Sequence, residues 1–174
     1  MYTCLVRLNS IVSYTTATFA VLTLAIYLTT AFDSHIANVD ISSGPVTLRK
    51  GRDMTTNERS ELANLNIDLK TDMTHLYNWN VKQLFIFLSA QYSTEKNQIN
   101  DVVLWDKIQR RGSARKIRLQ SAQTKYYFWD DGVGLRNNNN VTLYVTFNVI
   151  PIAGFMPLVK ATGTYRLDMP SSYN

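Results

Sequence analysis

Residues 11–32 read IVSYTTATFAVLTLAIYLTTAF, a stretch of 22 residues without a charged residue, glycine or proline. The charge-free gap is wider still, because the 25 residues between Arg7 and Asp33 include no Asp, Glu, Lys or Arg. At about 1.5 Å of rise per residue, a helix over residues 11–32 is about 33 Å long, enough to cross the hydrocarbon core of a bilayer. The stretch therefore predicts a single transmembrane helix, and the long buried helix of a soluble domain is disfavoured.

A cleaved signal peptide is the main alternative to a retained transmembrane helix. Thr29 and Ala31 resemble the small residues that precede a cleavage site. The apolar part of a signal peptide usually has about 7–15 residues, and the apolar stretch here is longer. We therefore expect an uncleaved signal anchor.

The charges that flank the helix predict its orientation. Arg7 and the α-amino group precede it and Asp33 follows it. The positive-inside rule therefore places residues 1–10 in the cytosol, and residues 33–174 are expected in the lumen of the secretory pathway or outside the cell. The single cysteine, Cys4, then lies on the cytosolic side.

One N-glycosylation triplet, Asn140-Val141-Thr142, occurs in the chain. It follows the polar run from Arg136 to Asn139, which is typical of an exposed turn. A glycan is added to such a triplet only on the lumenal side of a membrane, so the predicted orientation makes Asn140 a glycosylation site.

Beyond the helix, alternation with a period of two residues predicts β-strands. Val141, Leu143, Val145, Phe147 and Val149 alternate with more polar residues, which is the pattern of a half-buried strand. Residues 81–88 are apolar on both faces and are expected to form a central strand. The other expected strands are 36–41, 46–48, 65–70, 102–105, 116–119, 124–129 and 159–167. Short strands separated by turn signals, with no amphipathic helix, predict one all-β antiparallel sandwich over 33–174.

The sequence contains little material for catalysis. With one cysteine, an intramolecular disulfide and any zinc site with two or more cysteines are excluded. His35 and His75, the two histidines, do not lie in a recognisable catalytic context. Asp130-Asp131 and Gly132-Val133-Gly134 are better explained as a turn than as an acid–base pair or a phosphate loop. We expect no catalytic residue, no cofactor and no metal ion.

A basic segment from Lys107 to Lys125 holds seven Lys or Arg residues and no acidic one, within a chain of net charge +5. A lumenal location removes nucleic acid as a partner. Two interpretations stay open: the segment binds lipid headgroups or an acidic protein surface, or it is a solvated edge-strand face on which cations discourage aggregation.

Several blocks of the sequence closely resemble subunit 3 of the eukaryotic signal peptidase complex. They are YNWNVKQLF at 77–85, AQYST at 90–94, VVLWDKI at 102–108, TKYYF at 124–128, DDGVGL at 130–135, NVTL at 140–143, NVIPIAG at 148–154 and PLV at 157–159. They are in the expected order, and the resemblance covers nearly the whole chain, including the N-terminal span with TTAF at 29–32. The basic part 110–118 matches the family pattern least.

The resemblance implies a single-pass type II glycoprotein of the endoplasmic reticulum membrane with a lumenal β-sandwich and a glycan on Asn140. It further implies an accessory subunit without catalytic residues, whose partners are the catalytic and other subunits of the complex and the membrane lipid. Hydrolysis would belong to a partner with a serine nucleophile. The alternative is a secreted or lumenal β-sandwich binding module whose first 31 residues are removed. In either case Trp79, Phe85, Phe87 and Trp105 are expected to act by packing.

Overall fold

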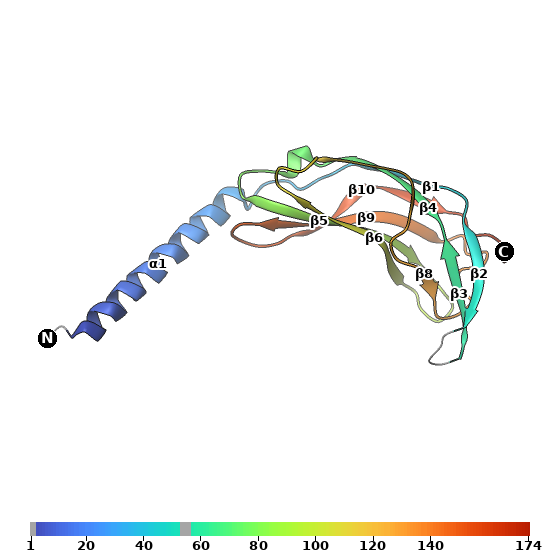
Figure 1. Cartoon of the computed structure of the whole chain (residues 1–174), viewed down its shortest axis with the longest axis horizontal. Coiled ribbons are helices and arrows are strands. Elements are labelled where there is room, and N and C mark those ends of the chain that lie inside the picture. Colours follow the sequence, from blue (N-terminus) through green and yellow to red (C-terminus); the bar gives the residue numbers. More distant parts are fainter. Residues whose placement is uncertain (1–2, 53–56) are drawn as a thin grey trace.

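The computed structural model describes residues 3–52 and 57–174, so the first two residues of the predicted cytosolic segment 1–10 lie outside the described residues. One long helix is followed by a β-rich domain (Figure 1). The elements are α1 Cys4–Thr30, β1 Val39–Ser43, β2 Thr47–Arg52, β3 Arg59–Asn64, β4 Asn66–Asp72, the 3₁₀ turn η1 Thr74–Leu76, β5 Val81–Tyr92, β6 Asn100–Arg110, β7 Lys116–Gln123, β8 Phe128–Asp130, β9 Val141–Pro151 and β10 Leu158–Leu167.

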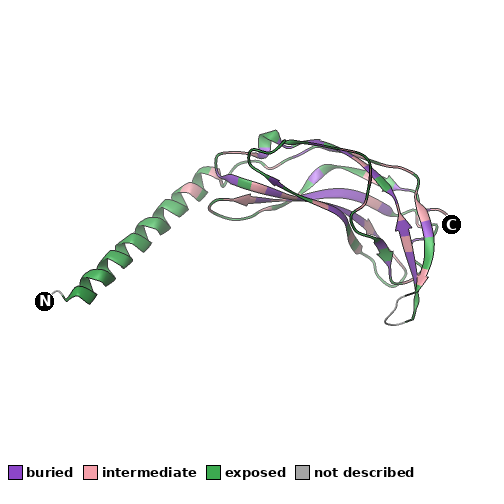
Figure 2. Cartoon of the chain, viewed as in Figure 1, coloured by how far each residue is buried: buried purple, intermediate pink, exposed green. Residues whose placement is uncertain are grey.

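Helix α1 begins seven residues before the predicted start and ends at Thr30, two before the predicted end. Thr3 caps it by accepting a hydrogen bond from the backbone N–H of Val6, and no glycine or proline interrupts the first turns. None of its residues is buried, as Figure 2 shows. In the described part of the chain it is the one helix long and apolar enough to cross a membrane.

Hydroxyl side chains along α1 are satisfied within the helix itself. Ser10, Thr16, Thr18 and Thr23 each donate to the carbonyl oxygen four residues earlier, at 2.7–3.0 Å. A hydroxyl that is bonded in this way can face an apolar surrounding at little cost. Thr16, Thr18 and Thr23 within 11–32 are therefore compatible with lipid around the helix.

The strands form three antiparallel sheets, in the orders β10-β9-β5-β6, β1-β4-β7 and β2-β3-β8. Strand β5 has neighbours on both sides, β9 and β6, which confirms its prediction as a central strand. A short parallel bridge between Asn38 and Thr162 joins the first two sheets at one edge.

All three sheets enclose a single core. In β9 the alternating residues from Val141 to Val149 are buried as their pattern predicts. They join the even-numbered residues of β5 from Leu84 to Tyr92, together with Ile67 and Leu69 of β4, in one apolar cluster. The predicted antiparallel β-sandwich is thereby confirmed.

Two strand predictions need correction. Residues 124–129 were expected to form a strand, but only Phe128 and Trp129 do so, in β8. The preceding residues lie against β6 instead, because Tyr126 donates its backbone N–H to the carbonyl of Leu104. Strand β3 was not predicted, since its buried positions include the polar Ser60 and Glu61 rather than an apolar alternation.

Candidate functional site

The β-domain is attached to the end of α1 by a buried asparagine. Asn80, 1% exposed, donates through Nδ2 to Thr30 Oγ1 at 3.0 Å and to the carbonyl of Ala153 at 2.9 Å. Its Oδ1 accepts the backbone N–H of Ala153 at 3.1 Å. Asn78 adds a bond of 2.6 Å to Asp33. These bonds hold the β9–β10 turn and the helix end together.

A small cavity of about 120 Å³ lies between the helix end and the domain, with Tyr27, His35 and Phe155 in its lining. His35 is half-buried there. The other predicted histidine, His75, is exposed on η1, with Nε2 2.5 Å from the carbonyl of Ile36. His75 thus contacts the residue that follows His35, and among the described residues no hydrogen bond joins the two imidazole rings. Within residues 3–52 and 57–174, no group of three His, Cys, Asp or Glu residues could hold a metal ion.

The outward side of the β10-β9-β5-β6 sheet, here called the outer face, carries a row of residues across all four strands. Leu158 pairs with Asn148, Asn148 with Phe85, and Phe85 with Ile108. Leu158 and Ile108 are 64% and 55% exposed. The Phe85 ring packs on that of Phe87, with centroids 5.6 Å apart. Apart from Asn148, this row of the outer face is thus apolar, and its two end residues are open to solvent.

A polar atom in this row lacks a partner. Asn148 Oδ1 is buried among its neighbours and accepts no hydrogen bond from the residues that the structure describes. Buried polar atoms are rarely left unpaired, because their desolvation costs about 1–3 kcal/mol.

Four of the seven cations in the basic segment contact other residues of the chain: Arg111, Arg115 and Lys116, described here, and Lys125, described next. Arg111 donates to the carbonyls of Asn78 and Val81, and Arg115 lies over the ring of Tyr77. Lys116 pairs with Asp72 at 3.3 Å. These contacts favour the structural interpretation of most of the segment.

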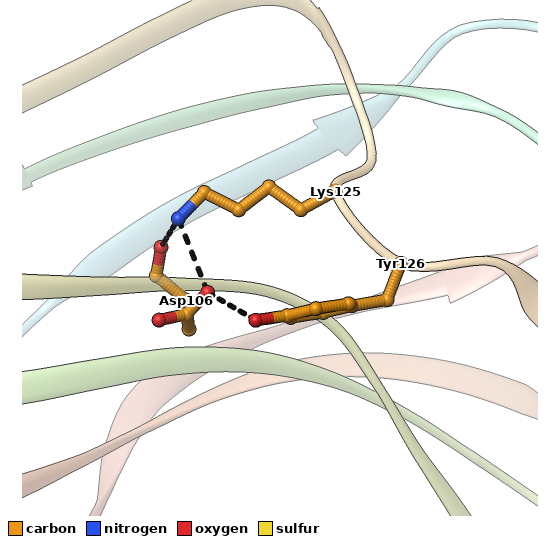
Figure 3. A network of polar contacts seen from close by, with 3 residues as sticks. All are labelled: Asp106, Lys125 and Tyr126. Carbon is orange, nitrogen blue, oxygen red and sulfur yellow. Dashed lines mark hydrogen bonds and ion pairs between the residues drawn. The ribbon is translucent and has the colours of Figure 1, made fainter.

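Lys125, the last cation of the segment, covers the free edge of β6 together with Tyr126 (Figure 3). Lys125 Nζ lies 3.1 Å and Tyr126 Oη 2.9 Å from Asp106 Oδ1. Burial raises the pKa of Asp106, but the hydrogen bonds and the charge of Lys125 outweigh it and lower the pKa overall. Asp106 therefore stays ionised and binds the segment that closes this edge.

Asn140 is exposed, directly before β9. Its Nδ2 donates to Ser93 Oγ at 2.8 Å. Strand β9 begins at Val141, next to Asn140, and ends at the turn beside α1. Its eleven residues span about 35 Å. The triplet therefore lies at the end of the domain opposite the helix, where a glycan has room.

Two buried carboxylates hold the loop that precedes Asn140. Asp130 accepts the Tyr92 hydroxyl at 2.7 Å and the N–H of Gly134 at 2.9 Å. Burial and this hydrogen bond raise the pKa of Tyr92 above its usual range. Glu61 accepts the N–H groups of Leu135 and Arg136. Asp130, which the sequence places in a turn with Asp131, is thus used to hold that turn in place.

The sequence predicts Asn140 as a glycosylation site, and the structure shows only that this residue is exposed; Asn80, Asn148 and Glu61 were not predicted. Each of these residues acts through partners distant in sequence or through its place in a sheet row, and no local motif marks them. Of the aromatic residues expected to pack, Trp105 is buried, Phe85 and Phe87 are half-buried on the outer face, and Trp79 is 56% exposed.

Fold and site together define a β-sandwich protein carried by an apolar helix that fits a membrane anchor, with exposed surfaces suited to a partner. The family described as signal peptidase subunit matches residues 1–172. Proteins named signal peptidase complex subunit 3 are 43% identical in Drosophila melanogaster, 44% in Gallus gallus and 42% in Homo sapiens, over 99% of this chain and 97% of each relative. The chain belongs to the signal peptidase subunit family, which confirms the resemblance found in the sequence.

Proposed function

We propose that this protein is a non-catalytic accessory subunit of the signal peptidase complex in the endoplasmic reticulum membrane. It supports the catalytic subunit, which carries a serine nucleophile, in cleaving signal peptides from nascent secretory proteins. The similarity to subunit 3 over nearly the full chain supports the assembly. The open outer face is the structural observation that carries a role in binding rather than in chemistry.

In the proposed topology, α1 spans the membrane within the predicted segment 11–32, residues 1–10 are cytosolic and residues 33–174 are lumenal. The charge asymmetry between Arg7 and Asp33 supports this orientation. The exposed Asn140, on the end of the domain remote from α1, supports a lumenal glycan.

The outer face is the proposed contact with the catalytic subunit. Its row of Leu158, Phe85 and Ile108 supplies apolar area, and aromatic rings such as those of Phe85 and Phe87 are enriched at protein interfaces. Charges at the rim, Lys160 and Asp106 in the neighbouring row, favour one orientation of docking.

Co-purification in mild detergent tests both parts of the proposal. The wild-type chain should bring down the catalytic subunit, and a chain that purifies without any signal peptidase subunit would contradict the assembly. Ile108→Asp, on the exposed edge of the outer face, should reduce recovery of that subunit. Val133→Asp is the matched control, because Val133 is 62% exposed on a loop away from the outer face. Equal recovery with both variants would contradict the docking surface alone.

The retained anchor has its own test. Amino-terminal sequencing of the mature protein should find residues before 11. A mature chain that starts near Phe32 would instead identify a secreted or lumenal binding module, the alternative that the sequence leaves open.

A further inference from the structure

The turn between β9 and β10 is apolar although it is solvent-exposed. Residues 137–159 contain no charged residue. At the turn itself, here called the hairpin tip and comprising residues 152–157, Ile152, Phe155 and Met156 are 67%, 74% and 53% exposed. An exposed cluster of large apolar side chains on a turn is costly in water and indicates an interaction site.

The hairpin tip lies beside the last turns of α1 (Figure 1). Gly154 approaches Tyr27 so closely that a Cβ on the glycine would be 2.6 Å from Tyr27 Cδ2. Asn80 holds Ala153 and Thr30 at the same time. The depth of the tip relative to a membrane is therefore set by the helix.

The distance between Tyr27 and the end of the charge-free segment indicates how deep the hairpin tip lies in a membrane. Tyr27 lies six residues before Asp33, or about 9 Å along the helix. If Asp33 is at the level of the headgroups, a turn packed on Tyr27 reaches the boundary between headgroups and acyl chains. Tyrosine itself is enriched at this level in membrane proteins.

We propose that the hairpin tip inserts into the lumenal leaflet of the bilayer, with Ile152, Phe155 and Met156 among the upper acyl chains. The domain is then attached to the membrane at two points, the helix and the tip, which limits its tilt. Phe32, 92% exposed, adds an aromatic residue near the helix end. The inference rests on the proposed membrane anchor and on no particular partner subunit.

The lone cysteine makes a direct test practicable. In a Cys4→Ser chain, a single cysteine is introduced by Phe155→Cys at the tip, by Leu24→Cys in the helix or by Val133→Cys on the remote loop, and is labelled with an environment-sensitive fluorophore. The full chain is placed in phosphatidylcholine nanodiscs. Quenching is measured with lipids that carry a nitroxide near the top of the acyl chain, and separately with aqueous iodide.

The label at position 155 should lose most of its fluorescence with the nitroxide lipid and little with iodide, whereas the label at position 133 should do the reverse. The label at position 24 reports on the anchor, and its insensitivity to nitroxide lipid would overturn the anchor itself. With position 24 quenched, iodide quenching at position 155 would overturn the insertion of the tip alone. Protection of position 155 from both quenchers in the assembled complex would also overturn it, since a protein would then cover the tip.

Discussion

The hydroxyl of Tyr173 donates a 2.5 Å hydrogen bond to Oε1 of Glu61, which joins the C-terminal segment to strand β3. The other carboxylate oxygen accepts the backbone N–H groups of Leu135 and Arg136 at 2.7 and 3.0 Å. Glu61 is 0% exposed, and its bond to Leu135 is fully buried, whereas those to Arg136 and Tyr173 are partly buried. The hydrogen bond to Glu61 also raises the pKa of Tyr173. One buried side chain therefore connects three segments that are far apart in sequence.

Removing this carboxylate should loosen all three segments. Glu61→Ala leaves buried donors unpaired, at about 1–3 kcal/mol for each buried donor, and opens a void. Glu61→Gln should cost less, because its amide oxygen can still accept from the Leu135 side. Chemical unfolding of the detergent-solubilised chain measures both variants. Stability of the alanine variant within about 0.5 kcal/mol of wild type would contradict the assigned role.

Three glycines at positive φ provide a graded series of backbone contacts. An alanine is strained at each position, but a Cβ at Gly112 meets nothing, at Gly154 it meets the Tyr27 ring, and at Gly163 it would lie 2.1 Å from the carbonyl oxygen of Val39. Stability should fall least for Gly112→Ala, more for Gly154→Ala and most for Gly163→Ala. Thermal unfolding of the three variants tests the order. Similar losses of thermal stability in all three variants would contradict a contribution from the Cβ contacts, because backbone strain alone would then explain the losses.

The local sequence could predict an element only where its inward side chains are apolar. Strand β9 follows from alternation because Val141 to Val149 are buried for their own hydrophobicity. Strand β3 could not be predicted in this way, since Glu61 is buried only because donors 74 and 75 residues further along the chain bind it. The same distinction applies to the candidate site. A local triplet predicts Asn140, whereas the outer face forms only when strand pairing places Phe85 beside Asn148, which no local motif predicts.

Two tyrosines, the half-buried Tyr77 and the buried Tyr144, should make the fold sensitive to alkali. Burial raises the pKa of Tyr77 from 10.0 to about 12, and burial with the hydrogen bond to Asp101 does the same for Tyr144. Their contribution is complete below pH 10, where both states hold the proton, and is lost as the pH rises to 12, because the unfolded chain releases the proton first. The free energy of unfolding, measured across this range, should fall less steeply in Tyr77→Phe. Tyr127→Phe, which changes an exposed tyrosine, should keep the wild-type slope.

Glycosylation of Asn140 tests independently whether residues 33–174 lie in the lumen. The wild-type chain from microsomes should shift in gel mobility after endoglycosidase treatment, and Asn140→Gln should abolish one glycan's worth of shift. Asn139→Gln is the matched control, since it changes the neighbouring asparagine and keeps the triplet. If the wild-type chain shows no shift, protease protection of residues 33–174 in sealed microsomes decides whether the triplet is skipped or the orientation is reversed.

Packing and chemistry make opposite predictions for cleavage of signal peptides. Trp105 is 6% exposed in the core, and truncation of a buried Trp costs about 3–5 kcal/mol of a domain stability of about 5–15 kcal/mol. Trp105→Ala should therefore lower cleavage by depleting the folded subunit, with normal activity in each complex that still assembles.

His35→Ala, His75→Ala and the double variant should leave cleavage nearly unchanged, because His75 contacts a backbone carbonyl and His35 lines a small cavity at the helix end. Loss of a general acid or base would instead reduce the rate by about 10²–10⁴ with the complex intact. Cleavage per assembled complex separates the two outcomes, and a large loss in either histidine variant at normal assembly would overturn the non-catalytic assignment.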